Sequence, residues 1–126
     1  MKYVCVAALL VAGLIHLLPI PGVMGASTLM RLYGIEVHDR NTAILLQHRA
    51  LLFGALGVLM LSAIALPWLR ITALSVGLFS TASFIFVAMG VGGYNSAIGR
   101  VVFADVVAAV LLAAGLLVEL WFPEKI

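Results

Sequence analysis

Charged side chains are scarce in this chain, and cysteine is almost absent. Asp, Glu, Lys and Arg make up 10% of the 126 residues, against roughly 25% in a soluble domain. The single cysteine, Cys5, excludes an internal disulfide and any metal site built from paired cysteines. The seven basic and five acidic side chains are spread along the chain. No basic block marks a surface for nucleic acid, so no nucleic-acid partner is expected.

Hydrophobic residues dominate instead. They form 65% of the sequence, and the mean hydropathy is +1.27. Apolar runs near 20 residues are typical of membrane-spanning helices. The sequence therefore predicts an all-α integral membrane protein, a four-helix bundle in a single domain over 1–126. The predicted spans are about 2–18, 41–66, 71–91 and 99–122.

The segment Ile20 to Arg40 is the longest connection between predicted spans. Its Pro21-Gly22 start suits a turn. The mixed polar and apolar residues up to Tyr33 predict a short interfacial helix between the first two spans. Asp39 or Asn41 is expected to cap the helix that follows.

An even number of spans places both termini on one side of the membrane. The loops 20–40 and 92–98 are then on the other side. Lysine and arginine are nearly balanced between the two sides, so the positive-inside rule does not decide the orientation. The amino terminus is similar to a signal peptide, which favours cytoplasmic termini.

Short motifs carry a resemblance to a known group. They are His16-Leu-Leu-Pro19, Leu32-Tyr33-Gly34-Ile35, the stretch from Ile44 to Ala50, and Phe53-Gly54-Ala-Leu-Gly57. They resemble small bacterial membrane proteins of four helices, and the layout is similar to the DoxX-like group. The resemblance implies a bacterial inner (plasma) membrane and a role beside quinone-linked redox enzymes. It supplies no catalytic motif.

Asp105 is the most informative polar residue. Only 13 uncharged residues separate it from Glu119, about 20 Å of helix, which is less than a hydrocarbon layer of about 30 Å. With Glu119 at the boundary beside Trp121, Asp105 is expected inside the layer, where carboxylates are usually paired or functional.

Distances along the helices suggest a partner for Asp105. The helical rise places Arg49 and His16 at similar heights, so we expect Asp105 to pair with Arg49. Either His16 or His48 is expected as a further hydrogen-bond partner. The remaining predicted ligand-binding residues, near the mouth of this cluster, are Tyr94, Asn95 and Arg100. The alternative is that Arg49 simply stands at the membrane boundary.

The histidines give little sign of a cofactor. His16, His38 and His48 are far apart in sequence and come from different elements, so no metal, haem or other cofactor is predicted. No hydrolase, metalloprotease or phosphate-loop motif is present, which argues against an enzyme.

Three functions fit these observations. The first is binding of an amphipathic small molecule, a membrane lipid or a quinone-like compound, between the helices. The second is an accessory subunit that packs, as a homo-oligomer or in a larger membrane complex, through the small residues Gly54, Gly57, Ala108 and Gly115. The third is a small proton-coupled transporter that uses His16 and Asp105. The first is preferred because it needs no unseen partner and uses the polar residues gathered at one end.

Overall fold

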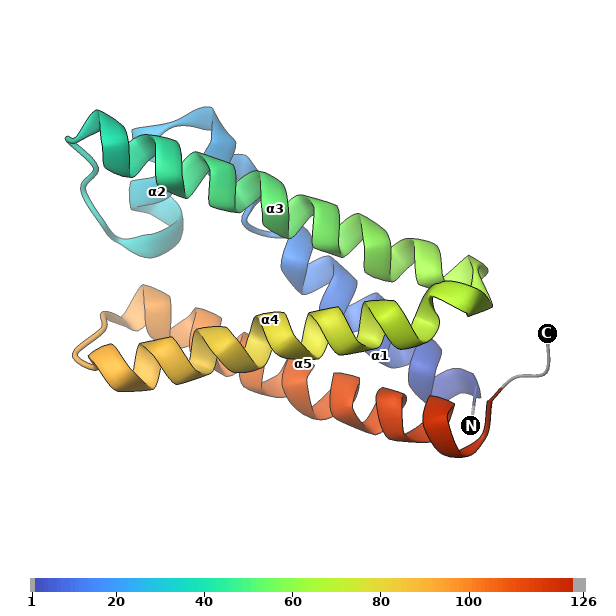
Figure 1. Cartoon of the computed structure of the whole chain (residues 1–126). Coiled ribbons are helices and arrows are strands. Elements are labelled where there is room, and N and C mark those ends of the chain that lie inside the picture. Colours follow the sequence, from blue (N-terminus) through green and yellow to red (C-terminus); the bar gives the residue numbers. More distant parts are fainter. Residues whose placement is uncertain (1, 124–126) are drawn as a thin grey trace.

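The computed structural model describes residues 2–123, and every regular element in that range is helical. The elements in chain order are α1 (Lys2–Leu17), η1 (Ile20–Met24), α2 (Ala26–Tyr33), α3 (Arg40–Ala65), η2 (Pro67–Leu69), α4 (Arg70–Val91) and α5 (Ser96–Trp121) (Figure 1). Four segments of this part of the chain, the first being α1 together with η1, are long and apolar enough to cross a membrane. They are compatible with a small integral membrane protein.

Side-chain caps set where two of the long helices begin. Asp39 accepts hydrogen bonds from the backbone N–H and the hydroxyl of Thr42, both at 2.9 Å, and so starts α3. These bonds stabilise the carboxylate and lower the pKa of Asp39. Asn95 accepts from the N–H of Ile98 at 2.8 Å and starts α5 at Ser96, three residues before the predicted start. Of the two expected caps for α3, Asp39 is the one used.

A short helix does occupy the predicted place between the first two long helices. Helix α2 ends at Gly34, which adopts a left-handed conformation with φ 65°. The side-chain amide of Asn95 donates to the carbonyl oxygen of Tyr33 at 2.8 Å and ties this helix end to α5. Whether α2 lies in a membrane interface stays a prediction.

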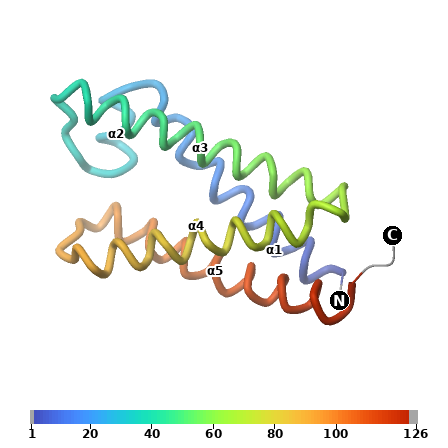
Figure 2. The backbone as a smooth tube through the Cα atoms, viewed as in Figure 1, coloured from blue at the N-terminus to red at the C-terminus, as the bar shows by residue number. Residues whose placement is uncertain are grey.

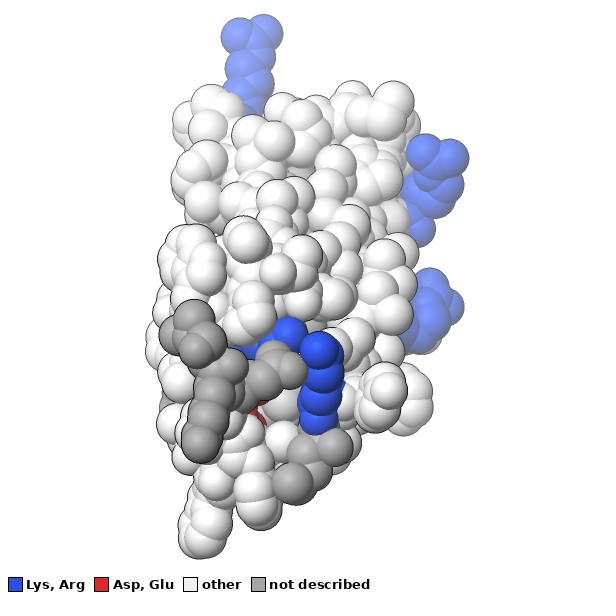
Figure 3. All heavy atoms as spheres, turned by 90° about the vertical axis from the view of Figure 1, so that its right-hand side faces the viewer, with Lys and Arg blue, Asp and Glu red and all other residues white. Residues whose placement is uncertain are grey.

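Helix α1 crosses the molecule and joins its two halves. Figure 1 and the tube in Figure 2 show it passing from the side of α5 to the side of α3, and it packs closely against both. Helices α4 and α5 form a second closely packed pair. Helices α3 and α4 meet at η2 and separate away from it. The start of α1 and the end of α5 lie at the end of the bundle where η2 lies. Of the described residues that Figure 3 shows at that end, most are uncharged.

Small residues allow the helices to approach closely. The buried core cluster is rich in alanine: Ala8, Leu9, Ala12, Met60, Ala63, Ala73, Leu74, Ala108 and Leu112. A Cβ atom on Gly57 would lie 2.7 Å from Cδ2 of Leu17 and 2.9 Å from the carbonyl oxygen of Gly13. The α1–α3 contact therefore requires glycine at this position.

The small-residue faces offered above as an external interface are used inside the chain. A Cβ atom on Gly54 would lie 3.0 Å from Ile20, and one on Gly115 would lie 3.1 Å from both Ala8 and Leu74. Ala108 is fully buried. Gly54 lies where α3 meets η1, Gly57 where α3 meets α1, and Gly115 where α5 meets α1 and α4. These small residues are therefore covered within the chain itself, and the oligomer stays a prediction.

Candidate functional site

Helix α5 carries two carboxylates on its buried face. The buried residues of this helix are Ala97, Asp105, Ala108, Leu112, Gly115 and Glu119, a spacing that keeps them on one side of a helix. Asp105 is 3% exposed, as predicted from its place in the sequence. Glu119, expected at the membrane boundary, is also enclosed by the bundle, at 7% exposure.

His16, at the end of α1, is fully buried and makes two hydrogen bonds. Its Nδ1 lies 2.8 Å from the carbonyl oxygen of Ala12, which can only accept, so Nδ1 carries a proton. Its Nε2 lies 3.1 Å from the hydroxyl of Ser80 on α4. In the neutral ring Nε2 accepts this bond from Ser80. Both ring nitrogens are thus occupied by Ala12 and Ser80, and His16 makes no hydrogen bond to the predicted Asp105–Arg49 pair.

Arg49, on α3, is held by aromatic rings. The centre of its guanidinium lies 4.5 Å from the ring centroid of Phe53, 5.4 Å from that of Phe84 and 5.6 Å from that of Tyr33. Such distances allow cation–π attraction. One guanidinium N–H also donates to the Tyr33 hydroxyl at 3.2 Å. The rings come from α3, α4 and α2, so Arg49 holds three elements together.

The predicted ion pair between Arg49 and Asp105 is not made. Within residues 2–123 the carboxylate of Asp105 has no hydrogen bond, and no basic nitrogen lies within 4.0 Å of it. Arg49 is close enough for its charge to act on Asp105, but the aromatic rings and Tyr33 hold the guanidinium instead. Every fully buried side-chain oxygen or nitrogen of the described residues has a hydrogen-bond partner. Because the carboxylate oxygens of Asp105 have no partner, they are not fully buried and stay accessible to a water-sized probe.

A groove between α3 and α4 opens beside Arg49. Its volume is about 390 Å³, within the range of roughly 300–1,000 Å³ usual for small-molecule pockets. The lining is Arg49, Leu52, Phe53, Leu56, Val76, Phe79, Ser80, Ser83, Phe84 and Val87. We call this the α3–α4 groove. Its walls are apolar except for Arg49 and two serines.

Most of the N–H donors of Arg49 have no hydrogen-bond acceptor among the described residues. Of the five N–H groups of a guanidinium, one has an acceptor among the described residues, the Tyr33 hydroxyl. The serine hydroxyls are already used, Ser80 by His16 and Ser83 by the carbonyl oxygen of Ser80 at 3.0 Å. The groove thus offers a cation with free donors and an apolar wall.

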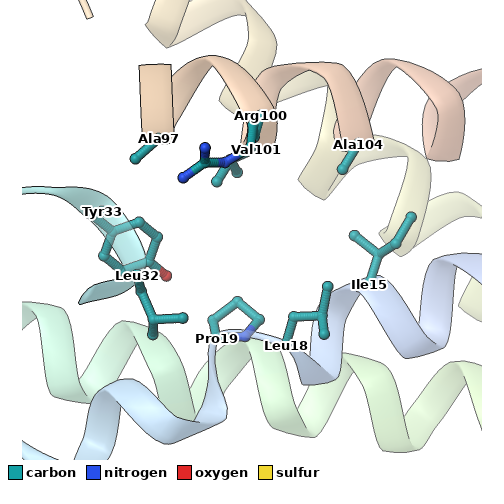
Figure 4. Close-up of a pocket in the computed structure, with 9 residues that line it drawn as sticks. All are labelled: Ile15, Leu18, Pro19, Leu32, Tyr33, Ala97, Arg100, Val101 and Ala104. Atoms are coloured by element: carbon teal, nitrogen blue, oxygen red, sulfur yellow. The ribbon is translucent and has the colours of Figure 1, made fainter. Parts of the chain in front are cut away.

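A second groove lies on the other side of Tyr33, between α1, α2 and α5. Its volume is about 190 Å³. The residues around it are Ile15, Leu18, Pro19, Leu32, Tyr33, Ala97, Arg100, Val101 and Ala104 (Figure 4). We call it the Tyr33–Arg100 groove. The hydroxyl of Tyr33 and the guanidinium of Arg100 both point into it.

The other predicted site residues make no hydrogen bond or ring contact with Arg49 in the described part of the chain. His48 is exposed on α3, and Asn95 is a helix cap tied to Tyr33. Tyr94 is 45% exposed and borders an apolar cavity of about 220 Å³ near the end of α4. Of the predicted set, His16 and Arg49 meet through Phe53, whose ring stacks on His16 at 5.3 Å, and Asp105 lies nearby.

Sequence reasoning missed the aromatic residues of the site. Phe53 follows Arg49 by four positions on one helix, a spacing that brings side chains together. The sequence alone could therefore have predicted the contact between Phe53 and Arg49. Tyr33 and Phe84 come from other elements, and no local signal in the sequence points to them.

Within the described residues no group of three His, Cys, Asp or Glu side chains is placed to hold a metal ion.

Comparisons with protein-family models, with curated proteins and with solved structures find no match for this chain. The likeness to the DoxX-like group therefore stays a prediction.

Proposed function

We propose that the protein binds an amphipathic small molecule of the membrane, a lipid or a quinone, in the α3–α4 groove. The head group accepts hydrogen bonds from Arg49, and the apolar part lies along the phenylalanine and aliphatic side chains of the groove. The single observation that supports this most is the guanidinium of Arg49, which lines an apolar groove and has one acceptor among the described residues.

Arg49 suits such a head group for a physical reason. Hydrogen bonds to a charged donor are about twice as strong as neutral ones, and they strengthen where water is excluded. A phosphate, carboxylate or quinone carbonyl supplies the oxygen acceptors that the free N–H groups need. The aromatic rings hold the guanidinium in place, so little side-chain entropy is lost when the ligand binds.

The alternatives have less support. A proton-coupled pair of His16 and Asp105 has no direct contact in the described structure, because Ala12 and Ser80 occupy His16. An accessory role through the small-residue faces loses its basis because those faces are packed internally. A place beside a quinone-linked redox complex depends on the DoxX-like resemblance alone.

The location follows the same proposal. We place the protein in a bacterial inner membrane with cytoplasmic termini, so that α2 and the loop before α5 lie on the outer side. The four apolar segments support a membrane location, and the signal-like amino terminus supports the orientation. The bacterial inner membrane depends on the DoxX-like resemblance.

Filling the groove tests this function. Ser83 lines the α3–α4 groove, so Ser83→Phe should displace the ligand. Ser75 is exposed on the same helix and does not line the groove, so Ser75→Phe is the matched control. Each variant is purified in mild detergent, and its co-purified lipids and quinones are quantified by mass spectrometry. The proposal expects one compound, retained by the wild type and by Ser75→Phe, to be lost from Ser83→Phe. Equal retention by both variants would contradict it.

A further inference from the structure

The Tyr33–Arg100 groove is rich in hydrogen-bond donors, and its one side-chain acceptor, the Tyr33 oxygen, already accepts from Arg49. Arg100 has no hydrogen bond or ion pair with any described residue, so all five of its N–H donors are available. The Tyr33 oxygen accepts from Arg49, and its own proton has no acceptor in the part of the chain that the structure describes. The other seven lining side chains are apolar.

Tyr33 is a built part of this groove and not a surface group. Tyr33 is only 6% exposed, and its hydroxyl points into the cavity (Figure 4). Arg49 donates to this hydroxyl at 3.2 Å, and a hydroxyl that accepts from a cation becomes a stronger donor. A ligand oxygen in the groove therefore gains from two cations, directly from Arg100 and through Tyr33 from Arg49.

The charge and polarity of the groove select the occupant. A group that supplies only acceptors, such as a carboxylate or phosphate, matches Tyr33 and Arg100 together. The apolar wall formed by Ile15, Leu18 and Ala104 continues away from these donors and matches a hydrocarbon chain. A head group that brings only donors would compete with Arg49 for the Tyr33 oxygen and gain nothing from the N–H groups of Arg100.

We propose that the Tyr33–Arg100 groove is a second ligand site, which binds a membrane amphiphile with an anionic oxygen head group, a fatty acid or an anionic phospholipid. The head group lies between Tyr33 and Arg100, and its chain lies against α1 and α5. This site is separate from the α3–α4 groove and does not depend on it.

Native mass spectrometry in a neutral detergent can count the bound molecules. Oleic acid and dioleoylphosphatidylglycerol are the two anionic probes, dioleoylglycerol is the uncharged probe, and inorganic phosphate is the head group without a chain. The wild type should bind at least one anionic amphiphile in preference to dioleoylglycerol, while phosphate alone should not compete. The two anionic arms tell a fatty-acid carboxylate from a lipid phosphate.

Two variants and two matched controls locate that molecule. Arg100→Gln should weaken its binding by about tenfold to a hundredfold, the usual range for a hydrogen bond to a charged group, while Arg31→Gln, at an exposed arginine of α2, should not. Ala104→Leu should fill the groove, while Ala55→Leu, at an exposed alanine of α3, should not.

Either of two results would overturn the proposal. One is equal weakening by Arg100→Gln and Arg31→Gln, which indicates a general effect of charge. The other is full binding to Ala104→Leu, which would place the molecule elsewhere. Ser83→Phe distinguishes this proposal from the function proposed above, since it should remove only a molecule in the α3–α4 groove.

Discussion

The guanidinium of Arg49 lies over the ring of Phe53, 4.5 Å from its centroid. The same ring stacks on His16 at 5.3 Å. One phenylalanine thus connects a cation of α3 with a buried imidazole of α1, and Ser80 continues the chain of contacts to α4. Each cation–π contact contributes about 0.5–2 kcal/mol. The cluster orders the end of the bundle where α3 and α4 separate.

The α1–α3 contact should fail when Gly57 gains a side chain. Gly57→Ala places a Cβ atom against Leu17 and the backbone of Gly13, so we expect a loss of about 1–3 kcal/mol in the free energy of unfolding. Gly90→Ala is the control, because a Cβ atom there meets nothing within 4 Å; it should be neutral or stabilising by up to about 1 kcal/mol. Unfolding by sodium dodecyl sulfate in mixed micelles measures both. Equal stability of the two variants would refute the close contact.

The bond between His16 and Ser80 gives a second stability prediction. Ser80→Ala leaves Nε2 of the fully buried His16 without its partner, at a cost of about 1–3 kcal/mol. Ser83→Ala removes a hydroxyl that bonds only a carbonyl of its own helix, and should change stability by less than about 0.5 kcal/mol. The same unfolding assay compares them. A smaller loss for Ser80→Ala than for Ser83→Ala would show that the His16 bond does not hold α1 to α4.

The cap of α3 should make stability depend on acid pH. Hydrogen bonds from Thr42 lower the pKa of Asp39 in the folded protein, so the ionised carboxylate favours folding. Its contribution is fully present above the unfolded pKa of about 3.9 and is lost as the pH falls through the lower folded pKa. Asp39→Asn keeps a capping oxygen without the charge. The wild type should melt above Asp39→Asn at neutral pH, and the difference should close in acid. A difference that is constant from pH 7 to pH 3 would exclude this cap charge.

The proposed orientation predicts which positions react from outside the cell. With Cys5 replaced by serine, single cysteines are placed at Glu36, Ser96 and Trp68, all exposed residues. A membrane-impermeant maleimide should label positions 36 and 96 in intact cells, and position 68 only after permeabilisation. Labelling of positions 36 and 68 from the same side would contradict four spans.

The sequence determined the helices better than the site. The length of an apolar run is a local property, and Asp39 and Asn95 mark the helix starts by their own side chains. Asp105, expected inside the membrane from the helix lengths, is buried within the bundle, and so is His16. Those distances do not give the rotation of each helix about its axis, and that rotation decides which side chains meet.

Arg49 shows the consequence. A partly buried guanidinium can be stabilised by a carboxylate or by aromatic faces, and the sequence pattern favoured the carboxylate Asp105. The structure uses Tyr33, Phe53 and Phe84. Two of these rings, those of Tyr33 and Phe84, belong to other helices. The hydrophobic periodicity of the sequence does not show how those helices pack against α3.

The central claim is that a selected amphiphile occupies the α3–α4 groove beside Arg49. The most direct measurement is photo-crosslinking in native membranes from benzoylphenylalanine at Val87, which lines the groove. Val58, on the outer face of α3, is the matched control, since the two are 58% and 59% exposed. The proposal predicts one enriched adduct mass at position 87, lost in Arg49→Gln, and a mixture of bulk lipids at position 58. The same mixture at both positions, unchanged by Arg49→Gln, would contradict it.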